Sequence, residues 1–104
     1  MSTIEAKQIV KNYAKFLKRK KFPFSSIFLF GSYAKGNARP WSDIDICVVS
    51  NKFKNKNWDK YERQLWYWRR QVDARIEPVG MSPDEFSNSS PLVYEIKKTG
   101  IRVE

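Results

Sequence analysis

Residues Ile27–Val49 read IFLFGSYAKGNARPWSDIDICVV, and this stretch decides the fold. Its first four residues are all apolar, as in a strand that is buried on both faces. Gly31-Ser32 follows directly and predicts a tight turn. After a polar loop, the last seven residues alternate in character, which predicts a second strand with Asp43 and Asp45 on one side. The stretch therefore predicts two strands, with a turn after the first and two carboxylates at the start of the second.

Helices and a further strand are predicted on either side of this stretch. Upstream, Ser2 and Glu5 have the spacing of a capping box and open a helix over residues 2–21. Downstream we expect a helix over 58–71, a strand over 72–78, helices that open at Ser82 and Ser90, and an edge strand over 101–103. This order predicts an α/β (α+β) fold in which helices pack on a small mixed sheet.

The composition favours one small enzyme or binding domain over residues 1–104. The chain contains no His, which excludes a Ser-His-Asp triad, a His general base and a His-ligated zinc site. Its single cysteine, Cys47, excludes an internal disulfide and fits a reducing compartment. No apolar run is long enough for a membrane span, so the expected location is the cytoplasm.

A formal net charge of +9 at pH 7 predicts attraction to polyanions. The candidates are nucleic acid, a nucleoside triphosphate and an acidic protein. Lys7, Lys11, Lys15 and Arg19 recur every four residues along the first predicted helix. This stripe is either a phosphate-facing surface or the solvated side of a surface helix, and the sequence leaves both interpretations open.

Asp43 and Asp45 are the residues with the clearest chemistry. Two carboxylates two positions apart on a strand lie on the same face and can converge on an oxygen-seeking cation. Between apolar neighbours their like charges destabilise the strand unless a cation neutralises them. At the preceding turn, Gly31 allows backbone N–H groups to approach a phosphate closely, and Ser32 adds a hydroxyl donor. These residues together favour a site for a metal and a phosphate.

Gly31-Ser32, ten intervening residues and Asp43-Ile44-Asp45 match the pattern GS-x10-D-x-D. With this motif the chain resembles the DNA polymerase β-like nucleotidyltransferase superfamily. In its length it looks most like the minimal nucleotidyltransferases (MNT) of that superfamily. The resemblance implies a polymerase β-like core that moves a nucleoside monophosphate, AMP from ATP, to a hydroxyl while pyrophosphate leaves. It implies two Mg²⁺ ions held with the nucleotide by Asp43, Asp45 and a third carboxylate, and a triphosphate held at Gly31 and Ser32.

The third carboxylate of the family maps best onto Asp73 in the predicted strand over 72–78. Glu77 is the alternative, because it lies on the same face of that strand. In a purely structural interpretation Asp73 pairs with Arg75 at the surface. Arg75 itself could contact a phosphate or form an ion pair with Glu77.

Minimal nucleotidyltransferases are found with HEPN-domain proteins, for which they serve as antitoxins, and some transfer AMP to the partner. The resemblance therefore implies a HEPN-domain partner and an acceptor hydroxyl on a protein. The chain cannot be a HEPN nuclease, since that activity needs a His. Trp66 and Tyr67, beside Arg63 and Arg70, form a candidate docking face. They lie outside the apolar stripe expected to be buried, which consists of Trp58, Tyr61, Leu65 and Trp68.

Three alternatives remain. The chain could be a non-catalytic partner-binding module with a vestigial acidic site. It could be a small-molecule transferase of the aminoglycoside-modifying kind, against which stands the lack of a substrate domain. It could also bind nucleic acid through Lys52, Lys54 and Lys56, although no RNP, KH or helix-turn-helix signature is present.

Overall fold

A four-stranded mixed sheet forms the centre of the structure, a computed structural model that describes residues 1–104. Its strands are β1 (Ser26–Phe30), β2 (Ile44–Val49), β3 (Ile76–Met81) and β4 (Ile101–Arg102). They lie in the order β3-β2-β1-β4, with β1 antiparallel to both of its neighbours and β2 parallel to β3. The predicted α/β architecture with a small mixed sheet is confirmed.

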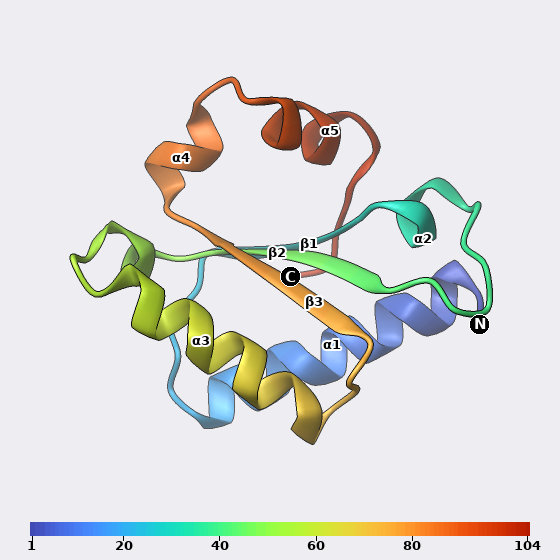
Figure 1. The fold of residues 1–104 in the computed structure, drawn as a ribbon, viewed down its shortest axis with the longest axis horizontal. Coiled ribbons are helices and arrows are strands. Elements are labelled where there is room, and N and C mark those ends of the chain that lie inside the picture. Colours follow the sequence, from blue (N-terminus) through green and yellow to red (C-terminus); the bar gives the residue numbers. More distant parts are fainter.

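Helices cover both faces of the sheet (Figure 1). One layer holds α1 (Thr3–Arg19) and α3 (Trp58–Trp68), and the other holds α4 (Pro83–Ser87) and α5 (Pro91–Thr99). The short helix α2 (Ser32–Lys35) follows β1 at one end of the sheet, and the 3-10 helices η1 (Asn51–Lys54) and η2 (Arg69–Gln71) flank α3. The capping box expected at Ser2 is present, and the helix expected to open at Ser82 begins with a capping box as well.

Two apolar clusters correspond to the two faces of the sheet. The larger cluster joins α1 and α3 to Ile44, Ile46 and Val48 of β2. The smaller cluster joins α5 to Cys47 and Val49 of the same strand. Alternate residues of β2 thus enter the cores on opposite faces of the sheet, as the sequence pattern predicts. By the same alternation Asp45 lies on the face that α5 covers, with Cys47 and Val49.

The third strand is displaced from its predicted position. We expected residues 72–78, but the strand begins at Ile76 and ends at Met81. The chain turns before it, because the N–H groups of Val72 and Asp73 both donate to the carbonyl of Arg69. The sequence prediction ended the strand at Pro78, yet Pro78 lies inside it. Since β3 is an edge strand, and the carbonyls of Arg75 and Met81 accept hydrogen bonds from Ile44 of β2 and from Ser50 just after it, the nitrogen of the intervening even-numbered Pro78 points away from β2, where it needs no N–H.

Two further predictions about local structure were wrong. The segment after Gly31 was expected to be a loop and contains α2, which is only four residues long. Trp58 was expected in the buried stripe of the long helix but is 51% exposed. It is the first residue of α3, and it lies beyond the part of the helix that faces the core; Leu65 is fully buried, while Tyr61 and Trp68 pack at the core margin.

None of the helices has the length and apolar character that crossing a membrane would require.

Candidate active site

Asp45 is positioned by the pairing of β2 with β1. It lies opposite Phe30, the last residue of β1, and on the sheet face covered by α5. Asp43 is exposed and immediately precedes β2. Burial, and after it the nearby charge of Asp43, raises the pKa of Asp45 above the usual carboxyl value. The two carboxylates therefore lie close enough to repel each other.

Gly31 brings the backbone of the β1–α2 turn against the carboxylate of Asp45. A Cβ atom at this position would lie 2.3 Å from Asp45 Oδ2, and the φ of Gly31 is +76° with ψ −153°. Only glycine adopts this conformation without strain. Ser32 follows as the first residue of α2, and its hydroxyl bonds to no other group of the chain. The predicted Gly31-Ser32 turn thus lies directly beside one of the two predicted carboxylates.

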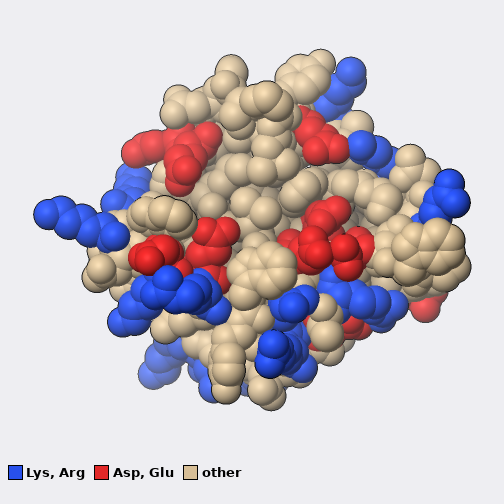
Figure 2. Space-filling view, viewed as in Figure 1, with Lys and Arg blue, Asp and Glu red and all other residues tan.

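Glu77 joins this pair from the neighbouring strand. The register of β2 and β3 places Glu77 beside Asp45. The pKa of Glu77 is raised, first by burial. The nearby Asp43 carboxyl, within hydrogen-bonding reach, and the charges of Asp43 and Asp45 raise it further. Asp43, Asp45 and Glu77 consequently form one cluster of mutually repelling carboxylates, and carboxylates gather near the middle of the face in Figure 2.

Asp73 is placed differently from the sequence prediction. It lies in the turn before β3, not on the strand, and its carboxylate accepts two hydrogen bonds from the Arg75 guanidinium at 3.0 and 2.7 Å. Those bonds hold the pKa of Asp73 below its usual value. The ion pair expected in the structural interpretation is therefore present, and Arg75 pairs with Asp73 and not with Glu77. Glu77, the alternative third carboxylate, is the one beside the Asp pair.

Three charged residues near the carboxylates were missed by sequence reasoning. Glu95 of α5 contributes to the raised pKa of Asp45, and it pairs with Lys35 of α2 at 2.8 Å. Arg69 donates to the carbonyls of Ala74 and, at 3.1 Å, of Ile76, and its charge lowers the pKa of Glu77. No local sequence signal connects these residues to the site, because each approaches it only through the tertiary fold.

The three carboxylates fit a divalent cation by their chemistry. They supply only oxygen donors, which Mg²⁺ prefers, and their mutual repulsion is the kind that a bound cation relieves. No three acidic side chains already surround a common point at ligand distances. A cation held there would need further oxygen ligands, and the phosphates of a nucleotide can supply them.

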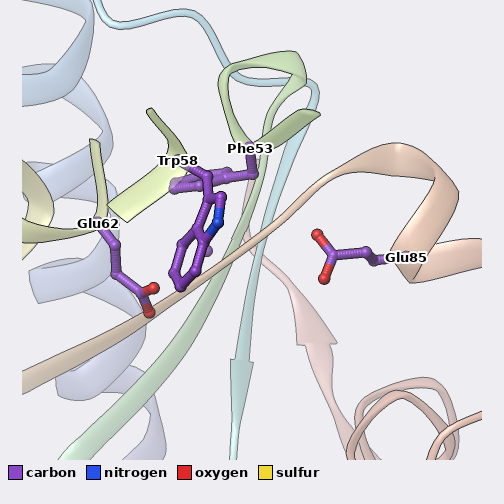
Figure 3. A pocket seen from close by; sticks show the side chains of 5 residues that line it. Phe53, Trp58, Glu62 and Glu85 are labelled. Atoms are coloured by element: carbon purple, nitrogen blue, oxygen red, sulfur yellow. The ribbon is translucent and has the colours of Figure 1, made fainter. Parts of the chain in front are cut away.

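A separate hollow of about 320 Å³ lies at the other end of β3 and is lined by Phe53, Trp58, Glu62, Gly80 and Glu85. Glu62 and Glu85 flank the ring of Trp58 from two different helices (Figure 3). Phe53 packs against Gly80, where a Cβ atom would meet its ring at 2.2 Å. The alternation of β3 directs Gly80 to the face opposite that of Glu77, so this hollow is not part of the carboxylate cluster.

The predicted docking face on α3 is exposed. Trp66 is 38% and Tyr67 is 67% exposed, and both line a shallow groove together with Trp58 and Arg63. The guanidinium of Arg69 lies 4.7 Å from the centre of the Trp66 ring. Aromatic and Arg side chains in such an arrangement are typical of protein interfaces.

Comparison with known sequences gives two results. A family model described as a nucleotidyltransferase domain matches residues 10–99. Two proteins of Methanocaldococcus jannaschii, each provisionally named a protein adenylyltransferase, are similar to the chain. One is 33% identical over 75 residues, which cover 72% of this chain and 74% of that protein. The other is 32% identical over 85 residues, and the match covers 75% of this chain and 56% of that protein.

Comparison with solved structures supports the fold. A MntA-HpeT toxin-antitoxin mutant, in which two aspartates two residues apart are replaced by glutamate, aligns with 88% of this chain and 72% of its own at a TM-score of 0.61 and 23% identity. A toxin-antitoxin structure with AMP-PNP aligns with 89% of this chain and 71% of its own at 0.62 and 23% identity. A protein of Sulfolobus solfataricus, provisionally named a nucleotidyltransferase, aligns with 98% of this chain and 86% of its own at 0.63 and 18% identity.

Proposed function

Since the chain belongs to the nucleotidyltransferase domain family, we propose that it transfers AMP from ATP to a hydroxyl group of a protein partner. The match over residues 10–99 establishes the type of enzyme. The names of the two archaeal relatives favour adenylyl transfer to protein. We propose further that residues 1–104 form one catalytic domain.

The observation that carries the proposal is the convergence of Asp43, Asp45 and Glu77 against the turn at Gly31. Transfer of a nucleoside monophosphate is mainly a matter of positioning and of neutralising phosphate charge, so it needs no histidine. Asp43 and Asp45 have the same spacing as the two aspartates that are replaced in the MntA-HpeT mutant. This agreement supports a role for both in the reaction.

Asp43, Asp45 and Glu77 are the residues that would hold Mg²⁺, with two ions when the nucleotide is bound. The ions would neutralise triphosphate charge and lower the pKa of the attacking hydroxyl. We assign Glu77, not Asp73, as the third carboxylate, because Asp73 is already paired with Arg75. In the reaction, the hydroxyl oxygen loses its proton and bonds to the α-phosphorus of ATP, the bond from that phosphorus to the oxygen bridging to the β-phosphorus breaks, and pyrophosphate leaves.

Gly31 and Ser32 would position the triphosphate. The missing side chain of Gly31 leaves the turn open to close approach, and the first N–H groups of α2 have no partners within that helix. The hydroxyl of Ser32 is free to donate to a phosphate oxygen. These groups can orient the α-phosphate beside the carboxylate cluster.

A HEPN-domain protein is the proposed partner and acceptor, with this chain as the antitoxin. Two of the similar solved structures are toxin-antitoxin complexes, one of them with AMP-PNP, and this supports both a protein partner and an adenine nucleotide. The exposed face of α3 around Trp66 and Tyr67 is the proposed docking surface.

The test is adenylylation of the protein encoded next to this chain. The two purified proteins are incubated with ATP and Mg²⁺, and the intact mass of the neighbour is followed. We expect a gain of one AMP on the neighbour, which Asp43→Asn and Glu77→Gln abolish. Trp66→Ala with Tyr67→Ala should slow modification by weakening the complex, while thermal unfolding checks that the fold is intact.

Other outcomes would contradict the proposal in distinct ways. A tight complex that gains no mass would favour the non-catalytic binding module. Transfer of labelled AMP to an aminoglycoside, with none to protein, would favour the small-molecule enzyme.

A further inference from the structure

The whole net charge of the protein belongs to one continuous segment. Residues 6–42 contain nine Lys and Arg and no Asp or Glu, whereas the rest of the chain contains eleven residues of each sign. Within the segment only Lys18 and Lys35 form ion pairs, with Glu104 and Glu95. Seven cations therefore have no carboxylate partner, a concentration that a uniformly basic surface would not produce.

Most of these cations lie along α1. The helix buries one side against the sheet through Ala6, Val10, Tyr13, Ala14 and Leu17. Lys7, Lys11 and Lys15 lie outside that side, Lys7 half-buried at its edge and Lys11 and Lys15 exposed, beside the neutral pair Gln8 and Asn12, which bond to each other at 3.0 Å. Successive lysines of the stripe are about 6 Å apart along the axis, and Arg19 and Lys20 extend it at the C-terminal end. The spacing suits a row of regularly placed negative charges.

The N-terminal end of α1 leads toward the carboxylate cluster. Thr3 Oγ1 donates to the carbonyl of Tyr33 in α2 at 2.6 Å, and residues 1–3 share a hollow with Gly36 and Ala38 of the following loop. Figure 1 shows the N-terminus beside this loop. The same loop contains Trp41, which is 74% exposed, with the Arg39 guanidinium 5.9 Å from the centre of its ring. An exposed aromatic ring thus belongs to the loop beside the start of α1, two residues before Asp43 in the chain.

The surface chemistry favours phosphates over an acidic protein. Stable protein interfaces have an apolar centre and are depleted in Lys. The exposed side of α1 beyond Ile4 has no large apolar side chain, whereas α3 exposes Trp58, Trp66 and Tyr67. The N-terminal end of this Lys-rich helix lies beside the loop that carries an exposed Trp and an Arg. Single-strand recognition uses two such features, a cationic track for the phosphates and an aromatic platform on which a base stacks.

We infer that the outer face of α1, with Arg39 and Trp41, binds single-stranded nucleic acid, its phosphates along Lys7, Lys11 and Lys15 and a base on Trp41. The inference concerns binding only and does not depend on the proposed adenylyl transfer. It also differs from a track over Lys52, Lys54 and Lys56, of which Lys54 pairs with Asp84 at 3.5 Å.

The test measures the affinity of the whole chain for a fluorescein-labelled RNA of about 12 nucleotides by anisotropy, in EDTA and without nucleotide. The triple variant Lys7→Gln, Lys11→Gln, Lys15→Gln keeps good helix formers at each position. We expect it to lose about tenfold or more in affinity at 0.1 M salt, and its salt dependence, as log K against log salt, to flatten by roughly two units. The matched control Lys60→Gln, Lys97→Gln, Lys98→Gln removes the same charge from α3 and α5 and should retain most of the affinity.

Trp41→Ala tests the stacking platform separately. It should weaken RNA binding at least fivefold, roughly the lower limit for one stacked base, without changing the salt dependence. A DNA strand of the same length should bind similarly, since the phosphates are shared. Equal loss in the two triple variants, or competition by oligo-glutamate as effective as by unlabelled RNA, would overturn the inference. The first result would show a general charge effect, and the second a surface for acidic protein.

Discussion

At the scale of single residues, Gly31 is the position where one added methyl group changes most. Its Cβ would meet Asp45 Oδ2 at 2.3 Å, in a backbone conformation that L-residues avoid. We expect Gly31→Ala to lower the free energy of unfolding by about 2 kcal/mol or more and to abolish the stabilisation by ATP with Mg²⁺. Both effects are measured by thermal and urea unfolding.

Gly36 provides the matched control for this prediction. Its φ is +77°, in the left-handed helical region, but no atom lies within 4 Å of a Cβ placed there. Gly36→Ala should lower the free energy of unfolding by only about 1 kcal/mol and leave the ligand response intact. Equal ligand responses in the two variants would show that Gly31 has no part in nucleotide binding.

The third carboxylate can be assigned by comparing two conservative substitutions. Glu77→Gln should eliminate AMP transfer and the Mg²⁺-dependent stabilisation by ATP, because Glu77 lies beside Asp45. Asp73→Asn should leave transfer largely intact, because Asp73 bonds to Arg75. Its surface ion pair contributes at most about 1 kcal/mol to stability. The reverse pattern in a transfer assay would return the role to Asp73.

The carboxylate cluster also predicts a pH dependence of stability. The pKa values of Asp45 and Glu77 are raised in the folded protein, so the folded state retains protons that the unfolded chain has released. Their contribution to stability therefore falls as the pH rises from the usual carboxyl range, near 4, through the raised pKa values of the folded protein. In the absence of divalent cations, Asp45→Asn should be more stable than the wild type at pH 7 by about 0.5 kcal/mol.

This gain should shrink as the pH falls toward the usual carboxyl range, because the raised pKa values let the folded wild type take up protons there. Urea unfolding of both proteins across that range in EDTA measures the difference. A variant less stable than the wild type at pH 7 would mean that Asp45 supports the fold and does not strain it.

At the scale of elements, one buried hydrogen bond joins α1 to α3. The Tyr13 hydroxyl donates to the carbonyl of Leu65 at 2.7 Å, and both residues are fully buried. Tyr13→Phe leaves that carbonyl without a partner and should lower the free energy of unfolding by about 1–2 kcal/mol. Tyr94 is 64% exposed and forms no side-chain hydrogen bond, so Tyr94→Phe should have no effect in the same urea titration.

The elements that the sequence predicts well are those with local signals. The capping box at Ser2 and the apolar runs of β1 and β2 act within a few residues, and their elements lie where they were expected. Strand β3 was misplaced because its limits depend on its pairing with β2 and on a turn that continues to Asp73. The carbonyl of Arg69 accepts the hydrogen bonds that form the turn before β3. That a proline at position 78 is tolerated follows only once β3 is known to be an edge strand. Because the strand was expected over 72–78, Asp73 was placed on it as the third carboxylate with Glu77 as the alternative, whereas in the structure only Glu77 lies on β3, beside Asp45.

At the scale of the whole molecule, the motif residues could be predicted from sequence, but their surroundings could not. The spacing of Gly31-Ser32 and Asp43-Ile44-Asp45 identified the turn and the Asp pair. Glu95 and Lys35 lie 60 residues apart in the chain, and they meet at the site only because α5 packs on β1 next to α2. The acid-free segment was likewise visible in the sequence, but its alignment along one side of α1 required the fold.

The distribution of charge predicts how stability responds to salt. Like charges gather in two places, the cations of residues 6–42 and the carboxylates of Asp43, Asp45 and Glu77. Within each group the charges repel one another. The ion pairs that salt would weaken are exposed at the surface and contribute little. Raising NaCl from about 0.02 to about 0.2 M shortens the range of charge interactions from roughly 20 Å to below 10 Å. The free energy of unfolding should therefore rise with salt, by about 0.5–1 kcal/mol.

The variants of α1 show whether the basic segment or the carboxylate cluster causes the salt dependence of stability. If the basic face of α1 dominates, the triple variant at Lys7, Lys11 and Lys15 is more stable than the wild type at low salt and loses about half of the salt response. The control triple at Lys60, Lys97 and Lys98 removes equal charge from regions that also contain carboxylates, so it should retain the full response. Urea unfolding at both salt concentrations compares the three proteins. A wild-type free energy of unfolding that falls with salt would contradict the prediction, because the ion pairs would then outweigh the repulsion along α1.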